Sequence, residues 1–478
     1  MRMRLSAAEL EERPVYMSKP DTVLLYVRPW NISQMEHLAQ GVWGEDVNLE
    51  CTSEHQAVDK SGLAADFNAA YRALGCDGAP RHLSEDEAVD VMLRCRLLRS
   101  VGRARARRLL VAMEQAVDEV LTRTQPKAML SLTIDSYVMD LFAILCRKRG
   151  IEFIGLVPSF VKEHFRITAR GEFVDSRPVK EEEIDAALAD LIVKDYRPDF
   201  LVQSSSEMRK QMWRLWLRNL PKPLWFALLR MRQGEALNYH YWASQQIARK
   251  FWGPWPRSLN GISGPDLAAL AEDGGHRLIY LPLQMSPEAT IDYWSADTRW
   301  IDYETFILDL VRRYRGKWRF LIKEHPNLLG YRSRGFYKRL EAEPNCIMVS
   351  PKVPSNDLVS LCDGVLVCTG TAGFEAALRG KPVLSDSEPY YANRGDLLPV
   401  AALDGDLPPQ SEDPERQRSL MAHVLRGTLP GRFLNNGKWS AENAQHREWS
   451  DTMANSIRGY LKRLDAQKAR PDQAQAHQ

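Results

Sequence analysis

Between residues 277 and 384 the chain alternates short apolar strands with helical segments, and this alternation constrains the fold more than any other feature. The expected strands are 277–281, 318–322, 346–349, 364–367 and 382–384. The expected helices between them are 303–314, 331–341, 355–361 and 372–378. Strands and helices that alternate at this spacing form a parallel sheet with helices on its faces. We therefore expect a Rossmann-like domain over residues 271–430.

A second alternation precedes the first one. Residues 22–27, 127–133 and 150–157 read as buried strands, with a helix at 138–148 and a stop at Pro158. The region between the first two strands reads as mostly helical. A strand, a helix and a strand at this spacing make a parallel unit, so we expect a second Rossmann-like domain over residues 1–270.

The chain of 478 residues is too long for one ordinary core and suits two domains. The expected fold class is α/β, with two Rossmann-like domains that face each other across a cleft. A helical insertion rich in tryptophan and arginine occupies about residues 180–256. A last helical region, residues 431–464, is expected to pack back across the domain junction, and residues 465–478 are expected to be a disordered tail.

The turn after the strand 364–367 has the composition of a phosphate site. It reads Thr369-Gly-Thr-Ala-Gly373 and opens a helix near Ala372. Small residues let the backbone approach a ligand, and the first N–H groups of a helix favour an anion. The hydroxyls of Thr369 and Thr371 can add donors, and Glu375 suits a ribose or sugar hydroxyl.

The strand 318–322 ends in a second polar turn. His325 can donate an imidazole N–H to the same phosphate, and Lys323 adds positive charge. Pro326 fixes the turn, and Asn327 shapes it. Either short motif alone is more often structural than functional, but their order and spacing together indicate a nucleotide site.

Three motifs, taken together, resemble a known family. They are residues 281–290 (Leu-Pro-Leu-Gln-Met-Ser-Pro-Glu-Ala-Thr), 323–327 (Lys-Glu-His-Pro-Asn), and 369–375 followed by Gly-Lys-Pro-Val at 380–383. In sequence and order they are similar to the capsule polysaccharide biosynthesis and export proteins that include bacterial Kdo transferases. The likeness covers about residues 275–400. The first motif departs from the family pattern, since Leu283-Gln-Met-Ser-Pro-Glu288 replaces an aromatic pair before Gln-Pro-Glu.

The resemblance implies a two-domain GT-B glycosyltransferase. The C-terminal domain would hold a nucleotide sugar, with CMP-Kdo or a related CMP-sugar as the implied donor, and the N-terminal domain would bind most of the acceptor. The resemblance also places Gln284 and Glu288 on the donor side. For Glu288, helix capping is the structural alternative. The departure in the first motif bears on the donor sugar more than on the fold.

Glycosyl transfer usually needs a base for the acceptor hydroxyl. Asp135 follows a predicted parallel strand, where ligands collect in such folds, and the alternative is that Asp135 caps the next helix. Glu163 and His164 are backup candidates. Ser131, Thr133 and Ser136 surround Asp135 and can bind an acceptor sugar. Arg28, after the first strand, can bind an anionic acceptor or form a surface ion pair.

Composition excludes several other classes. Lys and Arg number 64 against 62 Asp and Glu, so wholesale nucleic-acid binding is not expected. The seven cysteines lack any Cys-x-x-Cys pair, which favours reduced buried thiols in a cytoplasmic protein. We expect neither a signal peptide nor a spanning helix. No Asp-x-Asp pair stands at a strand end, so we expect a metal-independent site and no cofactor besides the donor.

The helical insertion carries aromatic anchors among cationic residues, at 208–219 and 224–232. This composition occurs at membrane surfaces, although a stripe of Trp and Leu at helical spacing is more often core. The expected protein is a glycosyltransferase that acts on a surface polysaccharide or glycolipid, with peripheral contact to the inner membrane face. A nucleotide-sugar 2-epimerase and a non-catalytic binding subunit of polysaccharide export remain alternatives.

Overall fold

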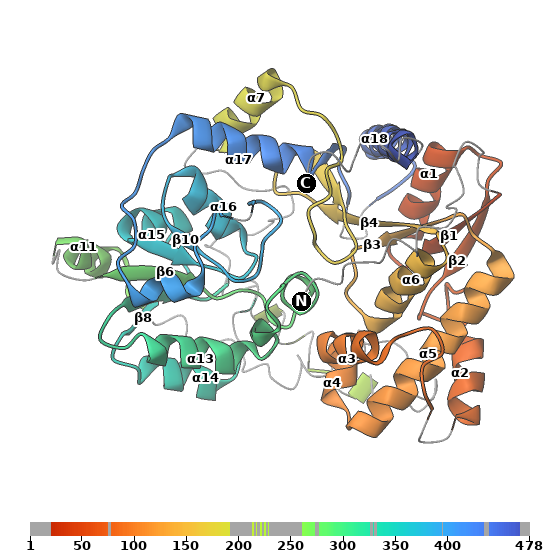
Figure 1. Cartoon of the computed structure of the whole chain (residues 1–478), viewed down its shortest axis with the longest axis horizontal. Coiled ribbons are helices and arrows are strands. Elements are labelled where there is room, and N and C mark those ends of the chain that lie inside the picture. The colour runs from red at the N-terminus through yellow and green to blue at the C-terminus, as the bar shows by residue number, and fades with distance from the viewer. Residues whose placement is uncertain are drawn as a thin grey trace.

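The computed structural model describes residues 21–74, 78–191, 213–214, 217, 220–221, 224–225, 228, 261–272, 277–325, 328, 332–393, 395–434 and 439–468. Figure 1 shows two α/β units, each built around its own sheet. The predicted fold class of two Rossmann-like α/β domains is confirmed.

The N-terminal sheet has the strand order β11-β5-β4-β3-β1-β2. Its strands are β1 (Thr22–Tyr26), β2 (Asn48–Thr52), β3 (Ala128–Leu132), β4 (Glu152–Pro158), β5 (His164–Ile167) and β11 (Leu429–Pro430). The strands from β2 to β4 pair in parallel, whereas β5 and β11 are antiparallel to their neighbours. The accompanying helices are α1 (Ile32–Trp43), α2 (Leu63–Ala73), α3 (Glu85–Arg94), α4 (Arg96–Ser100), α5 (Arg103–Thr124) and α6 (Tyr137–Lys148).

Strand β2 corrects the expectation that the region after the first strand is mostly helical. It pairs with β1 along its whole length, from Thr22 opposite Asn48 to Tyr26 opposite Thr52. At the edge of the sheet it buries only its last two residues fully. An edge strand needs fewer apolar residues than a central one, so its pattern is weak in the sequence.

The C-terminal sheet is parallel throughout and has the order β10-β9-β6-β7-β8. Its strands are β6 (Leu278–Pro282), β7 (Arg319–Lys323), β8 (Cys346–Val349), β9 (Gly364–Leu366) and β10 (Val383–Leu384). The remaining helices are α7 (Glu181–Leu191), α11 (Gly264–Glu272), α12 (Ala289–Asp292), η4 (Thr298–Ile301), α13 (Tyr303–Arg313), α14 (Arg334–Glu341), α15 (Ser355–Leu361), α16 (Thr371–Leu378), η6 (Val400–Asp404), α17 (Pro414–Arg426) and α18 (Ala444–Lys468). The predicted alternation of strands and helices is confirmed here.

Each sheet has one point where the chain reverses its direction of growth. From β1 the chain adds β2 on one side and then β3 on the other. From β6 it adds β7 and β8 on one side and then β9 and β10 on the other. In open α/β sheets, ligands bind outside the carboxyl ends of the two strands that flank such a point. The topology therefore directs attention to the turns after β1 and β3 and after β6 and β9.

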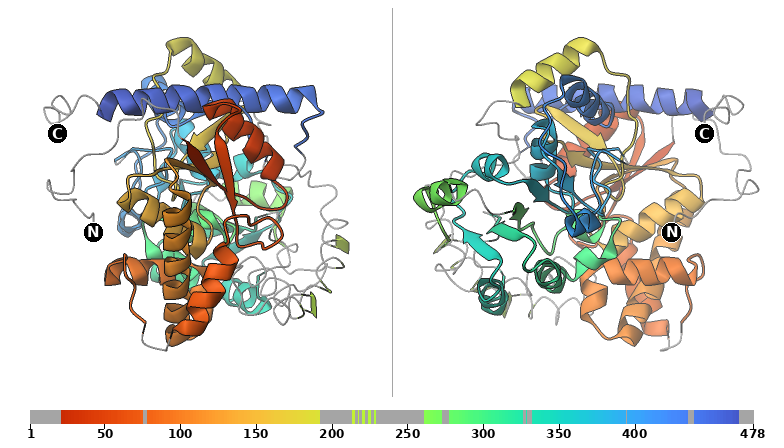
Figure 2. Two further views of the ribbon diagram at one scale, coloured as in Figure 1. Left: turned by 90° about the vertical axis from the view of Figure 1, so that its right-hand side faces the viewer. Right: turned by 60° about the vertical axis from the view of Figure 1, so that its left-hand side comes forward.

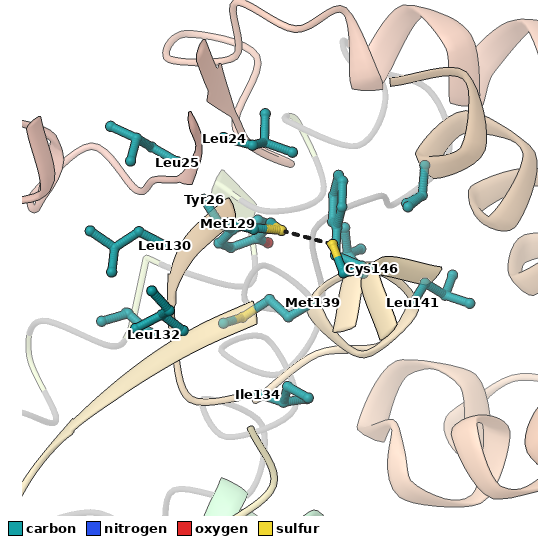
Figure 3. Close-up of a cluster of buried hydrophobic side chains, with 14 of the residues drawn as sticks. Leu24, Leu25, Tyr26, Met129, Leu130, Leu132, Ile134, Met139, Leu141 and Cys146 are labelled. Atoms are coloured by element: carbon teal, nitrogen blue, oxygen red, sulfur yellow. Dashed lines mark hydrogen bonds between the residues drawn. The ribbon is translucent and has the colours of Figure 1, made fainter. Parts of the chain in front are cut away.

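The centre of the N-terminal core lies between β1, β3 and α6. Figure 3 shows Leu24 and Tyr26 of β1 with Met129 of β3 and Cys146 of α6, all fully buried. The Sγ atom of Cys146 lies 3.9 Å from the Sδ atom of Met129. Central parallel strands are covered on both faces, which explains their continuous apolar runs. The six described cysteines are free, and five of them are buried.

Arginine side chains of the N-terminal unit hold the last residue of α12 and the segment that follows it. Arg96 and Arg99 both pair with the buried carboxylate of Asp292. Arg94 Nη1 donates to the carbonyl oxygens of Asp292 at 3.0 Å and Ser295 at 3.2 Å. Two guanidinium groups satisfy a carboxylate that burial would otherwise disfavour. This contact fixes one unit against the other.

Aromatic rings form a second contact between the units. Phe160, which follows β4, lies 4.5 Å from Phe374 of α16 and 5.9 Å from Tyr390, measured between ring centroids. Trp294 Nε1 donates to Thr133 Oγ1 at 3.2 Å, in the turn after β3. The carboxyl ends of strands in the first sheet therefore lie against helix α16 and loops of the second unit.

After α17 the chain returns to the N-terminal unit, where β11 extends the sheet and α18 packs on α1 (Figure 2). The outgoing and returning segments touch: Ser176 N donates to Arg426 O at 2.8 Å, and Arg177 Nε donates to Thr428 O at 3.0 Å. Helix α18 continues to Lys468, beyond the predicted start of the polar tail at residue 465. Residues 469–478 lie outside the described part of the chain.

Most of the Trp- and Arg-rich insertion also lies outside the described residues. Those that are described include exposed apolar side chains, namely Trp213, Leu217, Leu220, Leu224, Trp225 and Leu228. Among the described helices, none combines the length and the apolar character that crossing a membrane requires.

Candidate active site

Two predicted residues meet at the switch point of the N-terminal sheet. Arg28 follows β1, and Asp135 follows β3. Arg28 Nη2 donates to Asp135 Oδ1 at 2.5 Å, with the Arg28 side chain 5% exposed and the Asp135 side chain 19% exposed. A partly exposed carboxylate beside a buried guanidinium can accept a proton or a hydroxyl hydrogen bond. The pair stands where the topology predicts a ligand.

The alternative role of Asp135 as a helix cap is wrong. Ser136 is the N-cap of α6, and its side chain accepts from Met139 N at 3.4 Å. Ser136 and Ser131 are both fully buried, whereas Thr133 is partly exposed. Among the residues predicted to bind the acceptor or act as its base, Asp135 and Thr133 are therefore the ones that solvent reaches.

The backup candidates lie at the start of β5, where Glu163 ends the turn and His164 is the first residue of the strand. Glu163 is exposed, has a left-handed backbone with φ of 53°, and its carbonyl accepts from Gly431 N at 2.8 Å. The His164 ring Nδ1 lies 2.8 Å from Lys162 O, and burial lowers the pKa of His164. Both residues follow β4, two strands away from β1 in the sheet.

Two residues that the sequence reasoning missed, Glu54 and His55, lie beside the Arg28–Asp135 pair. They come just after β2, the strand that was not predicted. Tyr26 Oη donates to Glu54 Oε2 at 2.6 Å. Burial raises the pKa of Glu54 to about 7, against the attraction of Arg28. Burial, and then repulsion from Arg28, lowers the pKa of His55 to about 4.

The proton on Glu54 makes stability depend on pH. Its pKa in the folded chain lies above the ordinary value of 4.5, so the folded state holds a proton that the unfolded state has lost. Stability from this group therefore falls as pH rises from about 4.5 to about 7. Between pH 5 and pH 8, we expect the free energy of unfolding of the wild type to fall by on the order of 2 kcal/mol more than that of Glu54→Gln.

Chemical denaturation of both proteins at the two pH values measures this difference. Glu50→Gln, a half-buried change on β2, is the matched control. If the difference in free energy of unfolding between wild type and Glu54→Gln is the same at pH 5 and pH 8, the pKa of Glu54 is not raised.

At the switch point of the C-terminal sheet, Gln284 links two turns. With its amide oriented to satisfy both ends, the Gln284 side-chain oxygen accepts from Gly370 N at 2.8 Å and Cys368 N at 3.2 Å. Its backbone carbonyl accepts from Arg332, which also donates to Glu324 Oε2 at 2.6 Å. The turn after β6 is thereby joined to the turns after β9 and β7.

The turn after β9 opens helix α16 one residue before the predicted start, at Thr371. The first N–H groups of a helix have no intrahelical acceptor, and here these include the amides of Thr371 and Ala372. Thr369 Oγ1 donates to Thr290 O at 2.9 Å, so this proton is already engaged. Gly373 is buried, and a Cβ there would lie 2.3 Å from Tyr391 Oη. The turn is thus tightly packed from behind.

Three charged residues of the predicted donor site point to neighbouring groups. Lys323 Nζ donates to Val353 O at 2.6 Å and to Ser355 Oγ at 3.0 Å, and burial lowers the pKa of Lys323 to about 8. Burial raises the pKa of Glu375, and the positive charges of Arg379 and Lys323 oppose this shift. Burial likewise raises the pKa of Glu288, whose Oε2 accepts from Thr290 at 2.6 Å.

His325 follows a buried ion pair. Its backbone N–H donates to Glu324 Oε1 at 2.7 Å, which fixes the start of the turn. Burial, then repulsion from Arg332 and Lys323, lowers the pKa of His325 to about 4. Near neutral pH the imidazole is therefore neutral and carries one N–H donor. Pro326 and Asn327 lie outside the described residues.

Within the described part of the chain, no group of three His, Cys, Asp or Glu side chains has the arrangement of a metal site. What the described residues offer is a carboxylate on one sheet and helix amides with a neutral imidazole on the other. Such groups can accept a proton and stabilise a phosphate.

Comparisons with known proteins agree with the motifs. Residues 266–399 match the family model described as capsule polysaccharide biosynthesis protein, which confirms the resemblance over this segment. No curated protein matches the chain.

Similar solved structures include a KpsC beta Kdo 2,7 transferase of Thermosulfurimonas dismutans. Its sequence is 13% identical and its TM-score is 0.35, and the match covers 93% of this chain and 99% of that chain. A beta Kdo 2,4 transferase of the same organism has 16% identity and a TM-score of 0.31, over 62% and 78%. The UDP-GlcNAc 2-epimerase of Methanocaldococcus jannaschii has 11% identity and a TM-score of 0.25, over 92% and 99%. All three scores lie below 0.5, so these similarities add no argument about function.

Proposed function

We propose that this chain is a metal-independent GT-B glycosyltransferase. It moves a sugar, such as Kdo, from a nucleotide donor, preferably CMP-activated, to a capsular polysaccharide or glycolipid acceptor. The observation that carries the proposal is the placement of predicted site residues at both switch points. Arg28 and Asp135 flank one, and Gln284 and Gly370 flank the other.

In this proposal each unit has one task. The unit of residues 1–270, completed by β11 and α18, binds the acceptor. The unit of residues 271–430 binds the nucleotide sugar, and the family match to residues 266–399 supports this division. Two α/β units with loops in contact suit a reaction between two substrates held on separate sheets.

The chemistry follows from the groups at each site. The amides of Thr371 and Ala372 and the neutral imidazole of His325 stabilise the departing phosphate. In this site the dipoles of these N–H groups stabilise the negative charge that a metal ion would otherwise stabilise. Asp135 accepts the proton of the acceptor hydroxyl, and Arg28 orients its carboxylate at 2.5 Å.

The experiment combines nucleotide binding with turnover. CMP at 100 times its Kd should stabilise the folded protein by about 2.7 kcal/mol, visible as a thermal shift. His325→Ala should abolish release of CMP from CMP-Kdo while the unfolding temperature without ligand is unchanged. His325→Gln, which keeps an N–H donor, should retain part of the activity.

Other outcomes distinguish the rival functions. Wild-type turnover in His325→Ala removes the assignment of the donor site. A product formed from UDP-GlcNAc without any acceptor indicates an epimerase. Nucleotide binding without transfer to any acceptor indicates a binding subunit.

We also place the protein at the cytoplasmic face of the membrane, where such acceptors are made. The support is the exposure of Trp213, Leu217, Leu224 and Trp225 in a segment rich in arginine. Binding to anionic liposomes that weakens as salt rises is the expected result. No binding at low salt removes this part of the proposal.

A further inference from the structure

A pocket of about 490 Å³ lies on the N-terminal unit, between helix α1, the start of β2 and the segment before α18. We call it the α1 pocket, and its lining includes Ser33, Glu36, His37, Gln40, Leu49 and Trp439. Ligand pockets are commonly of this size, and they combine apolar surface with a few polar groups. The proposed transfer chemistry uses none of these side chains, so the α1 pocket is separate from the reaction centre.

Helix α1 supplies a polar wall of the pocket. The lining residues of this helix recur at positions i, i+3, i+4 and i+7, which places them on one face: Ser33, Glu36, His37 and Gln40. Within the described part of the chain, the exposed side chains of Ser33 and Gln40 form no hydrogen bond. Glu36 Oε1 lies 3.9 Å from Lys60 Nζ, which is a loose ion pair. A hydroxyl, an amide and a carboxylate are therefore available to a ligand.

The rest of the lining includes apolar groups and the partly exposed ring of Trp439. Trp439 Nε1 donates to Ser450 Oγ at 2.9 Å and to His446 O at 3.2 Å, which ties the indole to α18. The ring of His37 lies beside the indole, with centroids 5.3 Å apart and planes at 42°. His37 Nε2 in turn lies 3.1 Å from Asp451 Oδ1. An aromatic ring that is fixed before a ligand arrives loses little entropy on binding.

A sugar residue matches both parts of this lining. A pyranose has a C–H face that packs on an aromatic ring, and it has hydroxyls at its rim that need donors and acceptors together. The indole suits the first requirement, and the hydroxyl, amide and carboxylate of α1 suit the second. An acyl chain would cover these polar groups without giving them hydrogen bonds, which is unfavourable.

The position of the pocket relates it to the proposed acceptor. Since β1 and β2 are parallel, the helix between them starts at the carboxyl edge of the sheet and runs back toward the other edge. Asp135 follows β3, which is parallel to β1, and therefore lies at the edge where α1 starts. Ser33 is in the first turn of α1, and Gln40 is about 10 Å farther along the helix axis. A chain of sugars that ends at Asp135 can continue past the start of α1 into the pocket.

We propose that the α1 pocket is a second glycan-binding site, which holds an internal part of the acceptor chain while the end of that chain lies at Asp135. This inference rests on the proposed function and adds a property to it. The transferase binds a long acceptor more tightly than a short one, because the long chain contacts two places on the same unit.

Binding of defined oligosaccharides, measured by titration calorimetry, tests the pocket without any turnover. The probes are maltohexaose, cellohexaose, chitohexaose and a hyaluronan hexasaccharide, each with the disaccharide of the same series. We expect at least one hexasaccharide to bind wild type about 10-fold more tightly than its disaccharide. No binding of any hexasaccharide, or equal affinities for the two lengths in every series, overturns the proposal.

Variants of the lining locate the binding. Gln40→Ala and Trp439→Leu should each weaken hexasaccharide binding about 10-fold, through a lost hydrogen bond and a lost ring contact. Gln40 is exposed, so Gln40→Ala tests the pocket even if Trp439→Leu impairs folding. Glu119→Ala, at an exposed position of α5 that does not line the pocket, is the control and should bind as wild type does.

Two results with these variants overturn the proposal. One is hexasaccharide binding by Gln40→Ala that equals that of wild type. The other is a change of oligomeric state in Gln40→Ala, measured by light scattering, because the pocket would then be an interface between proteins.

Nucleotide binding and transfer separate this proposal from the one on which it rests. Gln40→Ala should show the same CMP thermal shift as wild type. Hexasaccharide binding that depends on Gln40, in a protein that neither binds CMP nor transfers sugar, leaves the glycan site standing while the transferase assignment fails. Transfer from CMP-Kdo to the hexasaccharide with the same KM in wild type and Gln40→Ala overturns the glycan site alone.

Discussion

Asp135→Asn is expected to lower the rate of glycosyl transfer about 10³-fold while the protein stays folded. The amide has the shape of the carboxylate but cannot accept the acceptor proton, and general-base catalysis typically contributes 10² to 10⁴-fold. The ion pair between Arg28 and Asp135 is lost at the same time. The measurement is the rate of transfer from CMP-Kdo, together with the CMP thermal shift, which should not change.

The control for this variant is Asp118→Asn. Asp118 pairs with Arg149 and His82 in the same unit but away from the switch point. It should transfer at the wild-type rate. If Asp135→Asn keeps more than a tenth of the rate, the proton goes elsewhere, and Glu163→Gln and His164→Gln become the next variants to measure.

The largest effect on stability is expected from Glu324→Gln, at about 3–5 kcal/mol of destabilisation. The side chains of Glu324 and Arg332 are 0% and 2% exposed. Burial opposes the charge of Arg332, yet attraction to Glu324 raises the pKa of Arg332 above its usual value. Tyr337 Oη also donates to Glu324, at 2.5 Å. The amide would leave a buried guanidinium without its counter-charge.

Chemical denaturation of wild type and Glu324→Gln at pH 7 measures the difference in their free energies of unfolding. Asp406→Asn removes a carboxylate whose pair with Arg277 is largely exposed, and it should change stability by less than about 1 kcal/mol. A loss under about 1 kcal/mol for Glu324→Gln contradicts the view that this pair holds the turns of His325 and Gln284 together.

The C-terminal unit was the part most readily predicted from the sequence. Strand β8 and helix α15 have the predicted bounds, because each is a short periodic segment between polar or proline-containing turns. Helix α16 begins one residue early, at Thr371. Local periodicity therefore located the strand-to-helix turns in which the donor residues were sought.

In the N-terminal unit, local sequence patterns predicted less of the structure. Strand β2 is a half-buried edge strand among helices, and missing it also hid Glu54 and His55. The pair of Arg28 and Asp135 joins residues 107 positions apart, and no local pattern encodes such a contact. Ser136, not Asp135, caps α6, although both residue types are good caps. Contacts between distant segments were thus the missing information.

A contact between two distant chain segments beside the junction of the units has a mechanical consequence. Residues 176–177 run outward and residues 426–428 run back, and they are hydrogen-bonded to each other. Glu181 and Asp185 of α7 hold Arg418 of α17 just beyond this point. These contacts hold α7 and α17 side by side next to the junction of the units. A rotation that moved the two units apart at their other contact would have to break the ion pairs of Asp292 with Arg96 and Arg99.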